Sequence, residues 1–464
     1  MNVIKKLKEA LEKSEHWTEI RYHHRQQTSI EIKNGEVSKV EDSTLAGVGV
    51  RCLVNGCWGF AATADMSEEA LAKAVREAAS AARVGSTLRK KKIEKIAEGE
   101  MAQGEYIYAD EGDDVQLKEK IDRFLNAEEL IRNKEDIISG IVNYSKYNDK
   151  KIILNTEGTQ AEVKDIKHDI GVVAVGNNGT SQEVGSVSAG VTGGWNDLFA
   201  EKSMMEMVEE AVNIARTKLE AEYAQGGEYT VILDPMLVGV LAHEAIGHTV
   251  EADFVMSGSI VQDKIGEKVA SEKVTMIDDG NVEKTAGMTL VDDEGTVAQK
   301  TTIIEDGILN EYLHNRESAA EFAVKPKGNA RAFTYRDEPL IRMTNTYIEE
   351  GDSSFEEMVS EIDNGYYLKG LGQGGQADAN AEFMFGVQEA YKIEDGQITD
   401  PVKGITISGQ AFNVLNSVDA VGDDLRFALG RGYCGKGQLA KVDAGGPHLR
   451  CKVTIGGKQE GDVQ

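Results

Sequence analysis

Two histidines flank a glutamate in the hexapeptide His243-Glu244-Ala-Ile-Gly-His248, and these residue types together are typical of a catalytic zinc site. Neutral imidazole is a good zinc ligand. A glutamate beside the first histidine is placed to accept a proton from water on the metal, as in zinc hydrolases. The motif therefore predicts metal-assisted hydrolysis, with His243 and His248 as ligands and Glu244 as the general base.

The two histidines are five positions apart, one more than in the common HExxH motif. On a regular α-helix, residues four apart diverge by about 40°, whereas residues five apart diverge by about 140°. Both can reach one metal ion only if the helix ends or bulges between them, and π-bulges are frequent at functional sites. Gly247 is of the residue type that tolerates such a backbone. The alternative is a surface helix with two chance histidines, but Gly247 would then weaken that helix for no structural reason.

The residues before the motif indicate a rigid support for it. Residues 229–233 are apolar and suited to a β-strand. Asp234 is a good helix N-cap, and Pro235 fits the first helical position. The apolar residues within 237–241 then predict a buried helix that delivers the motif.

A catalytic zinc ion is usually held by three protein ligands and a water, so one protein ligand remains to be found. Glu251 lies three residues after His248, on the same face if the helix continues. Asp253 is also near, but its spacing of five repeats the angular problem of the histidines. Cys434 is distant in the sequence and lies in Gly432-Tyr-Cys-Gly435, where small neighbours let a thiolate approach a metal. The residues alone leave these three candidates open.

Polar donors gather in residues 331–347, among them Arg331, Arg336, Arg342, Asn345 and Tyr347. We expect most of them to satisfy buried backbone groups. Arg336 and Asn345 are candidates for holding a carbonyl or carboxylate group of a substrate.

Several segments, taken together, resemble the TldD/PmbA family. The hexapeptide and the following Thr249–Phe254 are similar to the zinc-peptidase motif of that family. Each further segment is a weak signal alone, but their combination in the family's order is specific and extends over almost the entire chain. Only the TldD-type subunit has the metal motif, and this chain is similar to that type. The further segments are Asn315–Ser318, Gly328–Arg331, Tyr335–Arg336, Pro339–Tyr347, Lys369–Gly375 and Gly432–Lys436.

The resemblance implies a zinc metallopeptidase that acts on flexible or unfolded peptides. In this family a cysteine in a GxCGK setting completes the metal site, and Cys434 occupies that position. Glu251 then becomes a carboxylate that orients a ligating imidazole. The family also implies a homodimer or a heterodimer with a metal-free PmbA/TldE-type subunit. Two other functions stay open: a non-catalytic binding or modulator subunit, since the family is also called modulator of DNA gyrase, and a zinc amidase of other specificity.

The composition is that of a globular protein with an acidic surface. The 464-residue chain is 41% hydrophobic and 28% charged, with a net charge of −28, which argues against nucleic-acid binding. No run reaches the roughly 18 apolar residues of a membrane helix, so we expect no membrane span. The amino terminus has no apolar signal core and the four cysteines suggest no disulfide framework. We therefore expect a cytoplasmic protein.

The pattern along the chain predicts an α+β protein in three parts. Two small helix and β-hairpin domains are expected at residues 1–100 and 101–226, followed by a larger strand-rich zinc-binding domain at 227–464. Asn34-Gly35 and Asn55-Gly56 lie between alternating runs and are strong hairpin signals. The order helix, hairpins, helix recurs in the second part. The expected helices span residues 1–15, 66–84, 117–132 and 203–222; the expected strands span 18–33, 37–40, 47–54, 58–62, 137–147, 151–155, 159–163 and 168–175.

Overall fold

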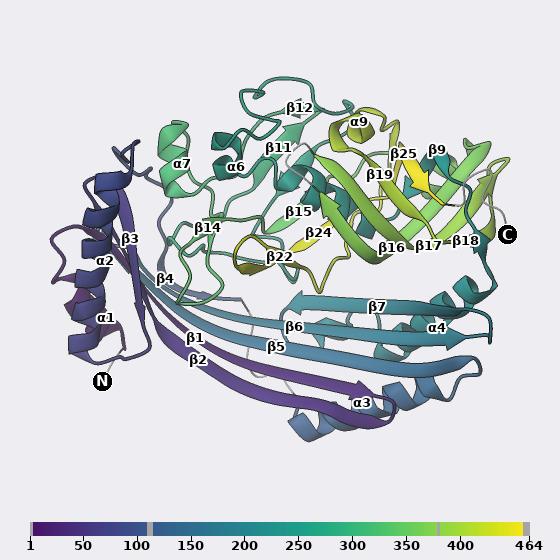
Figure 1. Cartoon of the computed structure of the whole chain (residues 1–464), viewed down its shortest axis with the longest axis horizontal. Helices are drawn as coiled ribbons and strands as arrows, with labels where there is room; N and C mark the ends of the chain where they lie inside the picture. Colours follow the sequence, from purple (N-terminus) through teal and green to yellow (C-terminus); the bar gives the residue numbers. More distant parts are fainter. Residues whose placement is uncertain (1–2, 109–114, 378–380, 458–464) are drawn as a thin grey trace.

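A long, curved sheet forms the amino-terminal half of the chain (Figure 1). The computed structural model describes residues 3–108, 115–377 and 381–457. The spatial order is β3-β2-β1-β5-β6-β4, and β7 also pairs with β6. All neighbours are antiparallel except β4 and β6. The strands are β1 (Trp17–Lys33), β2 (Glu36–Val54), β3 (Cys57–Thr63), β4 (Gln103–Ile107), β5 (Ile137–Asn155), β6 (Gln160–Asn177) and β7 (Gln182–Thr192).

Three of these strands are longer than the sequence predicted. We expected a break between 40 and 47, another between 147 and 151, and a third between 163 and 168, but β2, β5 and β6 run through all three. The polar residues at these three places are typical of turns. Each strand nevertheless stays hydrogen-bonded to a neighbouring strand there, and the β1–β2 ladder extends from Trp17↔Leu53 to Lys33↔Glu36. Because the neighbouring strands satisfy the backbone throughout, local polarity does not end the strand.

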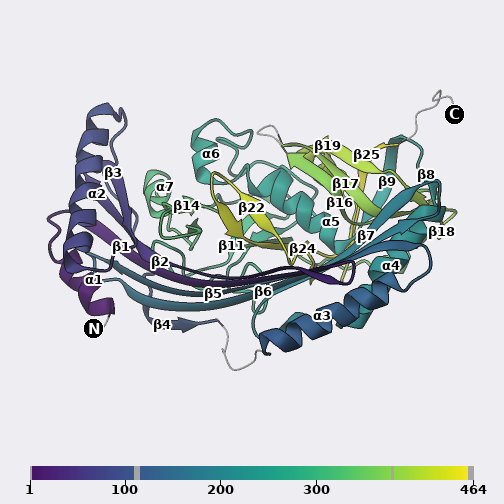
Figure 2. The ribbon, with the colours of Figure 1, turned by 60° about the horizontal axis from the view of Figure 1, so that its bottom comes forward.

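Helices pack on this sheet in two groups with the same order. The elements α1, β1, β2, β3, α2 are followed by α3, β5, β6, β7, α4, so the predicted recurrence of helix, hairpins and helix is present. In Figure 2, α3 and α4 lie on the face of the sheet that is turned away from the carboxy-terminal half. Since β1 pairs with β5, the two groups share one continuous sheet; the boundary near residue 100 stays a prediction. The helices are α1 (Val3–Leu11), α2 (Glu68–Leu88), α3 (Leu117–Arg132), the short η1 (Asp197–Phe199) and α4 (Met204–Glu220).

The carboxy-terminal half contains two larger sheets. One has the order β16-β9-β25-β19-β17-β18-β8, and β16 also pairs with β17, so five of its strands close into a ring. The other has the order β12-β11-β10-β15-β24-β21. The strands are β8 (Glu222–Tyr223), β9 (Gly227–Leu233), β10 (Met276–Asp278), β11 (Thr301–Glu305), β12 (Ile308–Leu309), β13 (Ala330–Arg331), β14 (Leu340–Ile341), β15 (Asn345–Ile348), β16 (Asn364–Ala377), β17 (Glu382–Glu394), β18 (Gln397–Lys403), β19 (Thr406–Gln410), β20 (Ala420–Val421), β21 (Arg426–Phe427), β22 (Tyr433–Gly435), β23 (Leu439–Lys441), β24 (Asp443–Gly446) and β25 (Leu449–Gly456).

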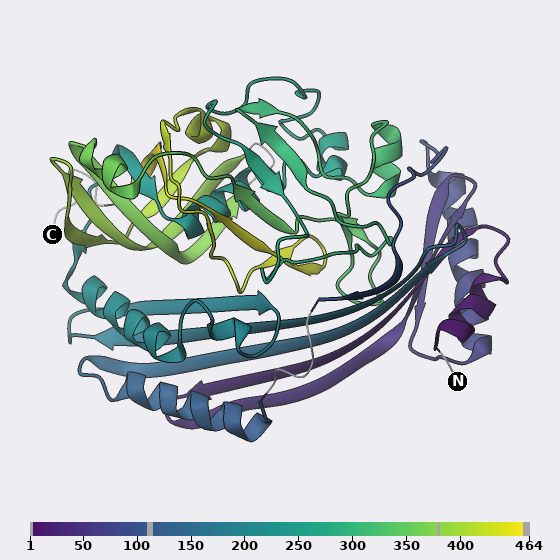
Figure 3. The same ribbon diagram turned by 180° about the vertical axis from the view of Figure 1, so that it is seen from behind.

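One hydrophobic core joins these two sheets and encloses a central helix. It includes Leu233 of one sheet, Ile348 of the other, and Leu237, Leu241 and Ile246 of the helix between them. This half of the molecule lies over the long sheet, as the view from behind shows (Figure 3). Among the described residues, no helix has both the length and the apolar character needed to cross a bilayer. The helices are α5 (Pro235–Val240), η2 (Leu241–Gly247), α6 (Ala252–Met256), α7 (Arg316–Glu321), α8 (Phe355–Ser360) and α9 (Ala411–Asn416).

Candidate metal centre

The HExxxH motif lies on a strand, cap and helix arrangement of the predicted kind. Strand β9 ends at Leu233, and the side chain of Asp234 accepts a hydrogen bond of 3.0 Å from the Leu237 amide. Pro235 begins helix α5, where its missing N–H leaves no donor unsatisfied. Because α5 is buried against both sheets, the residues that follow it have a fixed direction.

The predicted bulge between the histidines is a π-helix. Element η2 (Leu241–Gly247) has π geometry from before His243 up to Gly247, His248 is its C-cap, and the imidazole centroids of His243 and His248 are 5.3 Å apart. The wider turn brings residues five apart onto one side, which a regular α-helix would not do. The reason for glycine at 247 differs from the one expected. A Cβ there would lie 2.1 Å from Met343 Sδ, so any larger residue at 247 would force the Met343 side chain to shift.

Cys434 lies beside the two histidines, although it follows His248 by 186 residues. Its Sγ is 3.1 Å from His248 Nε2, and one ligand atom from each of the three residues lies within 4.8 Å of the others. Cys434 is carried by the hairpin of β22 and β23. The structure thus brings together the three residues that the family resemblance indicated as ligands.

Glu251 and Asp253, the other two candidates, lie behind His248. Glu251 is fully buried, and its Oε2 is 3.4 Å from His248 Nδ1, the ring nitrogen away from Cys434. Lys436 Nζ bonds Glu251 Oε2 at 2.7 Å and Asp253 Oδ1 at 2.8 Å. Both carboxylates therefore share an ion pair with one lysine, two residues after Cys434, and the geometry suits Glu251 for orienting His248.

The electrostatics of the two imidazoles differ. His243 is 1% exposed, and neither of its ring nitrogens has a hydrogen-bond partner. Burial holds its pKa well below the usual value, so the ring is neutral and able to act as a ligand. Burial alone would also lower the pKa of His248, but hydrogen bonds with Cys434 and Glu251 outweigh it and raise that pKa to about 10.

These side chains fit a zinc ion. A buried polar atom without a partner is costly, and a cation would satisfy the unpartnered nitrogen of His243. Imidazole and thiolate are both good zinc ligands, and three protein ligands with an open fourth position are typical of catalytic zinc sites. The donor chemistry and the unpartnered His243 together favour a metal centre over a packed core cluster.

Glu244 is the half-exposed member of the motif. Its Oε2 lies 3.8 Å from His248 Nε2, and its side chain is 40% exposed. Together with His243 and Cys434 it lines a cleft of about 1180 Å³ between the long sheet and the carboxy-terminal half. Other lining residues come from β7, from the segment of η1 and α4, from β16 and β17, and from residues 282–285 and 425–434. A carboxylate at this position can exchange a proton with a molecule bound in the cleft.

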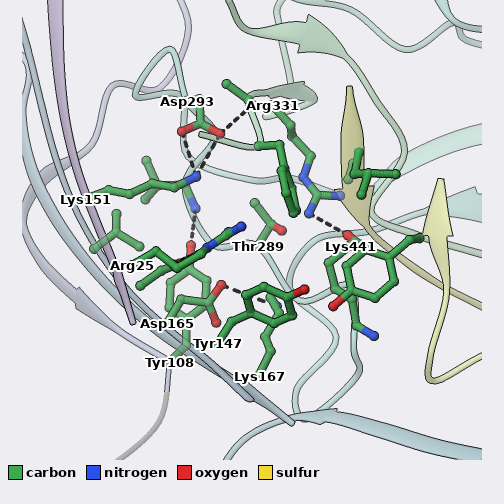
Figure 4. A pocket seen from close by; sticks show the side chains of 18 residues that line it. Arg25, Tyr108, Tyr147, Lys151, Asp165, Lys167, Thr289, Asp293, Arg331 and Lys441 are labelled. Atoms are coloured by element: carbon green, nitrogen blue, oxygen red, sulfur yellow. Dashed lines mark hydrogen bonds and ion pairs between the residues drawn. The ribbon is translucent and has the colours of Figure 1, made fainter. Parts of the chain in front are cut away.

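Two arginines that the sequence did not assign to the site hold the cysteine hairpin. Arg342 donates to the Cys434 carbonyl at 2.6 Å and to the Gln438 carbonyl at 2.9 Å. Arg331 donates to the Lys441 carbonyl at 2.6 Å, and this contact is visible in Figure 4. Both arginines bind backbone carbonyl groups, as expected for most of the polar donors in residues 331–347. Nothing local in the sequence says that the backbone they bind belongs to the metal site.

Arg336 and Asn345, the candidate substrate residues, do not line the cleft. Arg336 is exposed and bonds the hydroxyl of its neighbour Tyr335 at 3.0 Å. Asn345 is fully buried and donates to the Asp279 carbonyl at 2.7 Å. Within the described part of the chain, neither side chain has a hydrogen bond to His243, His248 or Cys434, so a substrate role for them rests on the sequence pattern alone.

Comparisons with known proteins place these features in context. The chain matches the models of the PmbA/TldA metallopeptidase domain 1 at residues 18–82, the central domain at 110–219 and the C-terminal domain at 226–457. It is 35% identical to a metalloprotease of Methanothermobacter thermautotrophicus over 93% of each chain. It is 30% identical to a protein of Saccharolobus solfataricus named zinc metalloprotease TldD homolog, over 98% of this chain and 100% of the relative.

Solved structures share the fold at lower sequence identity. A Thermotoga maritima protein described as "a putative modulator of a DNA gyrase" superposes with a TM-score of 0.79 at 23% identity, covering 98% of this chain and 99% of that one. TldE from Thermococcus kodakarensis superposes with a TM-score of 0.76 at 19% identity, covering 98% of this chain and 100% of that one. At such identities these likenesses show the fold alone.

Proposed function

The chain belongs to the PmbA/TldD metallopeptidase family, and on that basis we propose that it is a zinc-dependent peptidase that hydrolyses flexible or unfolded peptides. The observation that carries the proposal is the convergence of His243, His248 and Cys434, with ligand atoms within 4.8 Å, beside Glu244 in the cleft. Support also comes from the relatives named metalloprotease, one of which carries zinc in its name.

In this proposal His243, His248 and Cys434 hold the zinc ion and leave one position open. When bound, zinc supplies Lewis-acid chemistry: it makes water acidic near neutral pH and polarises the carbonyl group that is attacked. Glu251 fixes the orientation of His248 through Nδ1, 3.4 Å away. Lys436 forms an ion pair with the buried Glu251 carboxylate and balances its charge.

Glu244 is the proposed proton carrier. Its carboxylate accepts a proton from the attacking water and passes it to the leaving amine as the peptide bond breaks. Its partial exposure suits this role, since a buried carboxylate could not reach both the water and the substrate. In this proposal both proton transfers therefore depend on the Glu244 carboxylate at the wall of the cleft.

The cleft suits an extended chain. Its volume of about 1180 Å³ is that of a peptide segment and not of a folded domain. Strand β7 lines it and pairs with no strand other than β6 among the described residues. The Gln388 side chain already bonds the Ser186 backbone at the outer edge of β7, and we propose that the backbone groups beyond this contact bond the main chain of a peptide. Main-chain pairing depends on the conformation of the bound peptide more than on its side chains. It therefore favours flexible peptides that can become extended and does not select one amino-acid sequence.

We also propose a paired assembly and a cytoplasmic location. A homodimer, or a heterodimer with a metal-free subunit of the TldE type, is supported by family membership and by the shared fold with TldE. All four cysteines are free, and a reducing compartment would keep the Cys434 thiolate available for metal.

One experiment separates the proposal from its alternatives. The zinc-loaded chain is incubated with a peptide library and with amide substrates lacking a peptide bond, with and without a TldE-type partner. Cleavage of peptides that requires zinc supports a peptidase. Cleavage of the amides alone would make the protein an amidase. Stoichiometric zinc without turnover under any of these conditions would favour a binding or modulator subunit.

A further inference from the structure

The hairpin that carries Cys434 has two faces with different partners. Its register pairs Cys434 with Ala440 and Tyr433 with Lys441. Because side chains alternate along a strand, Tyr433 and Lys441 share one face and Cys434 projects from the other. The Cys434 face meets His248 at 3.1 Å. The opposite face meets the long amino-terminal sheet.

A single carboxylate of that sheet binds both side chains of the opposite face. Asp169, on β6, is 1% exposed. It accepts a hydrogen bond of 2.9 Å from the Tyr433 hydroxyl and forms an ion pair with Lys441. The Lys441 ammonium also lies 4.5 Å from the centre of the Tyr433 ring. Ser145 on β5 donates to the same carboxylate at 3.2 Å.

The backbone next to the hairpin is in equally close contact with the sheet. A Cβ at Gly190 of β7 would lie 2.2 Å from the Gly430 carbonyl oxygen, so two glycines allow direct packing of main chain on main chain. Lys441 Nζ also donates to that carbonyl at 2.7 Å. The position of the loop that leads into Cys434 is therefore set by its contacts with the sheet.

We propose that Asp169 is a positioning residue for the third metal ligand and couples the amino-terminal sheet to the metal affinity of the carboxy-terminal half. The inference rests on the proposed zinc site. Arg331 and Arg342 hold the hairpin from within its own half, and Asp169 holds it from the other half. A buried polar network of this kind selects one arrangement of the groups that it joins. When the Asp169 contacts are lost, the hairpin face opposite Cys434 is no longer held, and the zinc affinity of the site falls.

The test compares two tyrosine-to-phenylalanine variants. Tyr433→Phe removes one hydroxyl that binds Asp169 and keeps the buried ion pair with Lys441. The matched control is Tyr144→Phe, which removes a buried hydroxyl bonded at 2.8 Å to His168 Nδ1, in the helix-facing core of the same sheet. Three quantities are measured on the full chain: zinc affinity by chelator competition, the thiolate-to-metal absorption band with Co²⁺, and the melting temperature of the metal-free protein.

We expect Tyr433→Phe to weaken zinc binding about tenfold and to alter the Co²⁺ band, since removing groups behind a metal ligand typically costs about 10–100-fold in affinity. Tyr144→Phe should lower the melting temperature to a similar extent and leave both metal readouts unchanged. Asp169→Asn should weaken zinc more than Tyr433→Phe.

Wild-type zinc affinity in both Tyr433→Phe and Asp169→Asn would overturn the inference, as would an equal loss in Tyr144→Phe. If the wild-type chain binds neither zinc nor Co²⁺, the proposed function fails first, and the inference fails with it. Selective weakening in the two Asp169-linked variants, with a folded metal-free protein, would support the coupling.

Discussion

Adding one methyl group at Gly247 tests whether close packing sets the π-helix that aligns the histidines. In Gly247→Ala the new Cβ would lie 2.1 Å from Met343 Sδ and 3.2 Å from the Ala242 carbonyl oxygen. Met343 is fully buried, so its side chain has little room to retreat. Overpacking of this kind costs about 1–3 kcal/mol. Alanine favours helical backbone over glycine by about 1 kcal/mol, which leaves a net destabilisation of about 0–2 kcal/mol.

The sign of the effect should reverse when the clash is removed. In a Met343→Ala background, Gly247→Ala should stabilise the protein by up to about 1 kcal/mol, because the helix preference then outweighs the remaining 3.2 Å contact with the Ala242 carbonyl oxygen. The assay is thermal unfolding of the four zinc-free proteins of this cycle, with zinc affinity measured in parallel. We expect Gly247→Ala alone to weaken zinc about tenfold, since it shifts the turn that carries both histidines. The same destabilisation in both backgrounds, or unchanged zinc affinity, would refute the packing argument.

Three further outcomes follow from the site. His243→Ala or His248→Ala should reduce the zinc content from about one ion per chain to near zero in elemental analysis, and full occupancy in both would remove the motif from the site. Glu244→Gln should keep the fold and the zinc while kcat/KM for peptides falls by about 10²–10⁴, whereas a zinc-loaded variant with near-normal cleavage would contradict the role of Glu244 as general base. Cys434→Ser should weaken zinc strongly in chelator competition, because a hydroxyl replaces a thiolate poorly, and the equally buried Cys451→Ser should leave it unchanged; equal behaviour of the two would exclude Cys434 as a ligand.

The local parts of the site were predictable because short-range geometry specifies them. The spacing of His243 and His248 requires a bulge on angular grounds, and the structure has a π-helix there. Asp234 and Pro235 mark the start of the supporting helix through their own backbone chemistry. The sequence could not choose Cys434 over Glu251 from spacing, since a contact across 186 positions depends on how two sheets meet. The family resemblance supplied that choice.

The parts that the sequence missed depend on partners far along the chain. Polar stretches in β2 and β5 looked like turns, but neighbouring strands keep them extended. Asp169 had no local signal at all, because its role arises only where β6 meets the cysteine hairpin. Gly247 was identified correctly as unusual for a helix, but the reason, the side chain of Met343, lies 96 positions away and is set by tertiary packing.

X-ray absorption spectroscopy at the zinc edge tests the central claim most directly. The full chain is loaded with one equivalent of zinc, and the scattering atoms around the metal are identified by type and distance. The account predicts one sulfur at about 2.3 Å and two imidazole nitrogens at about 2.0–2.1 Å, with the sulfur signal absent in Cys434→Ser. A zinc ion surrounded only by nitrogen and oxygen in the wild-type protein, with a spectrum unchanged in Cys434→Ser, would contradict it.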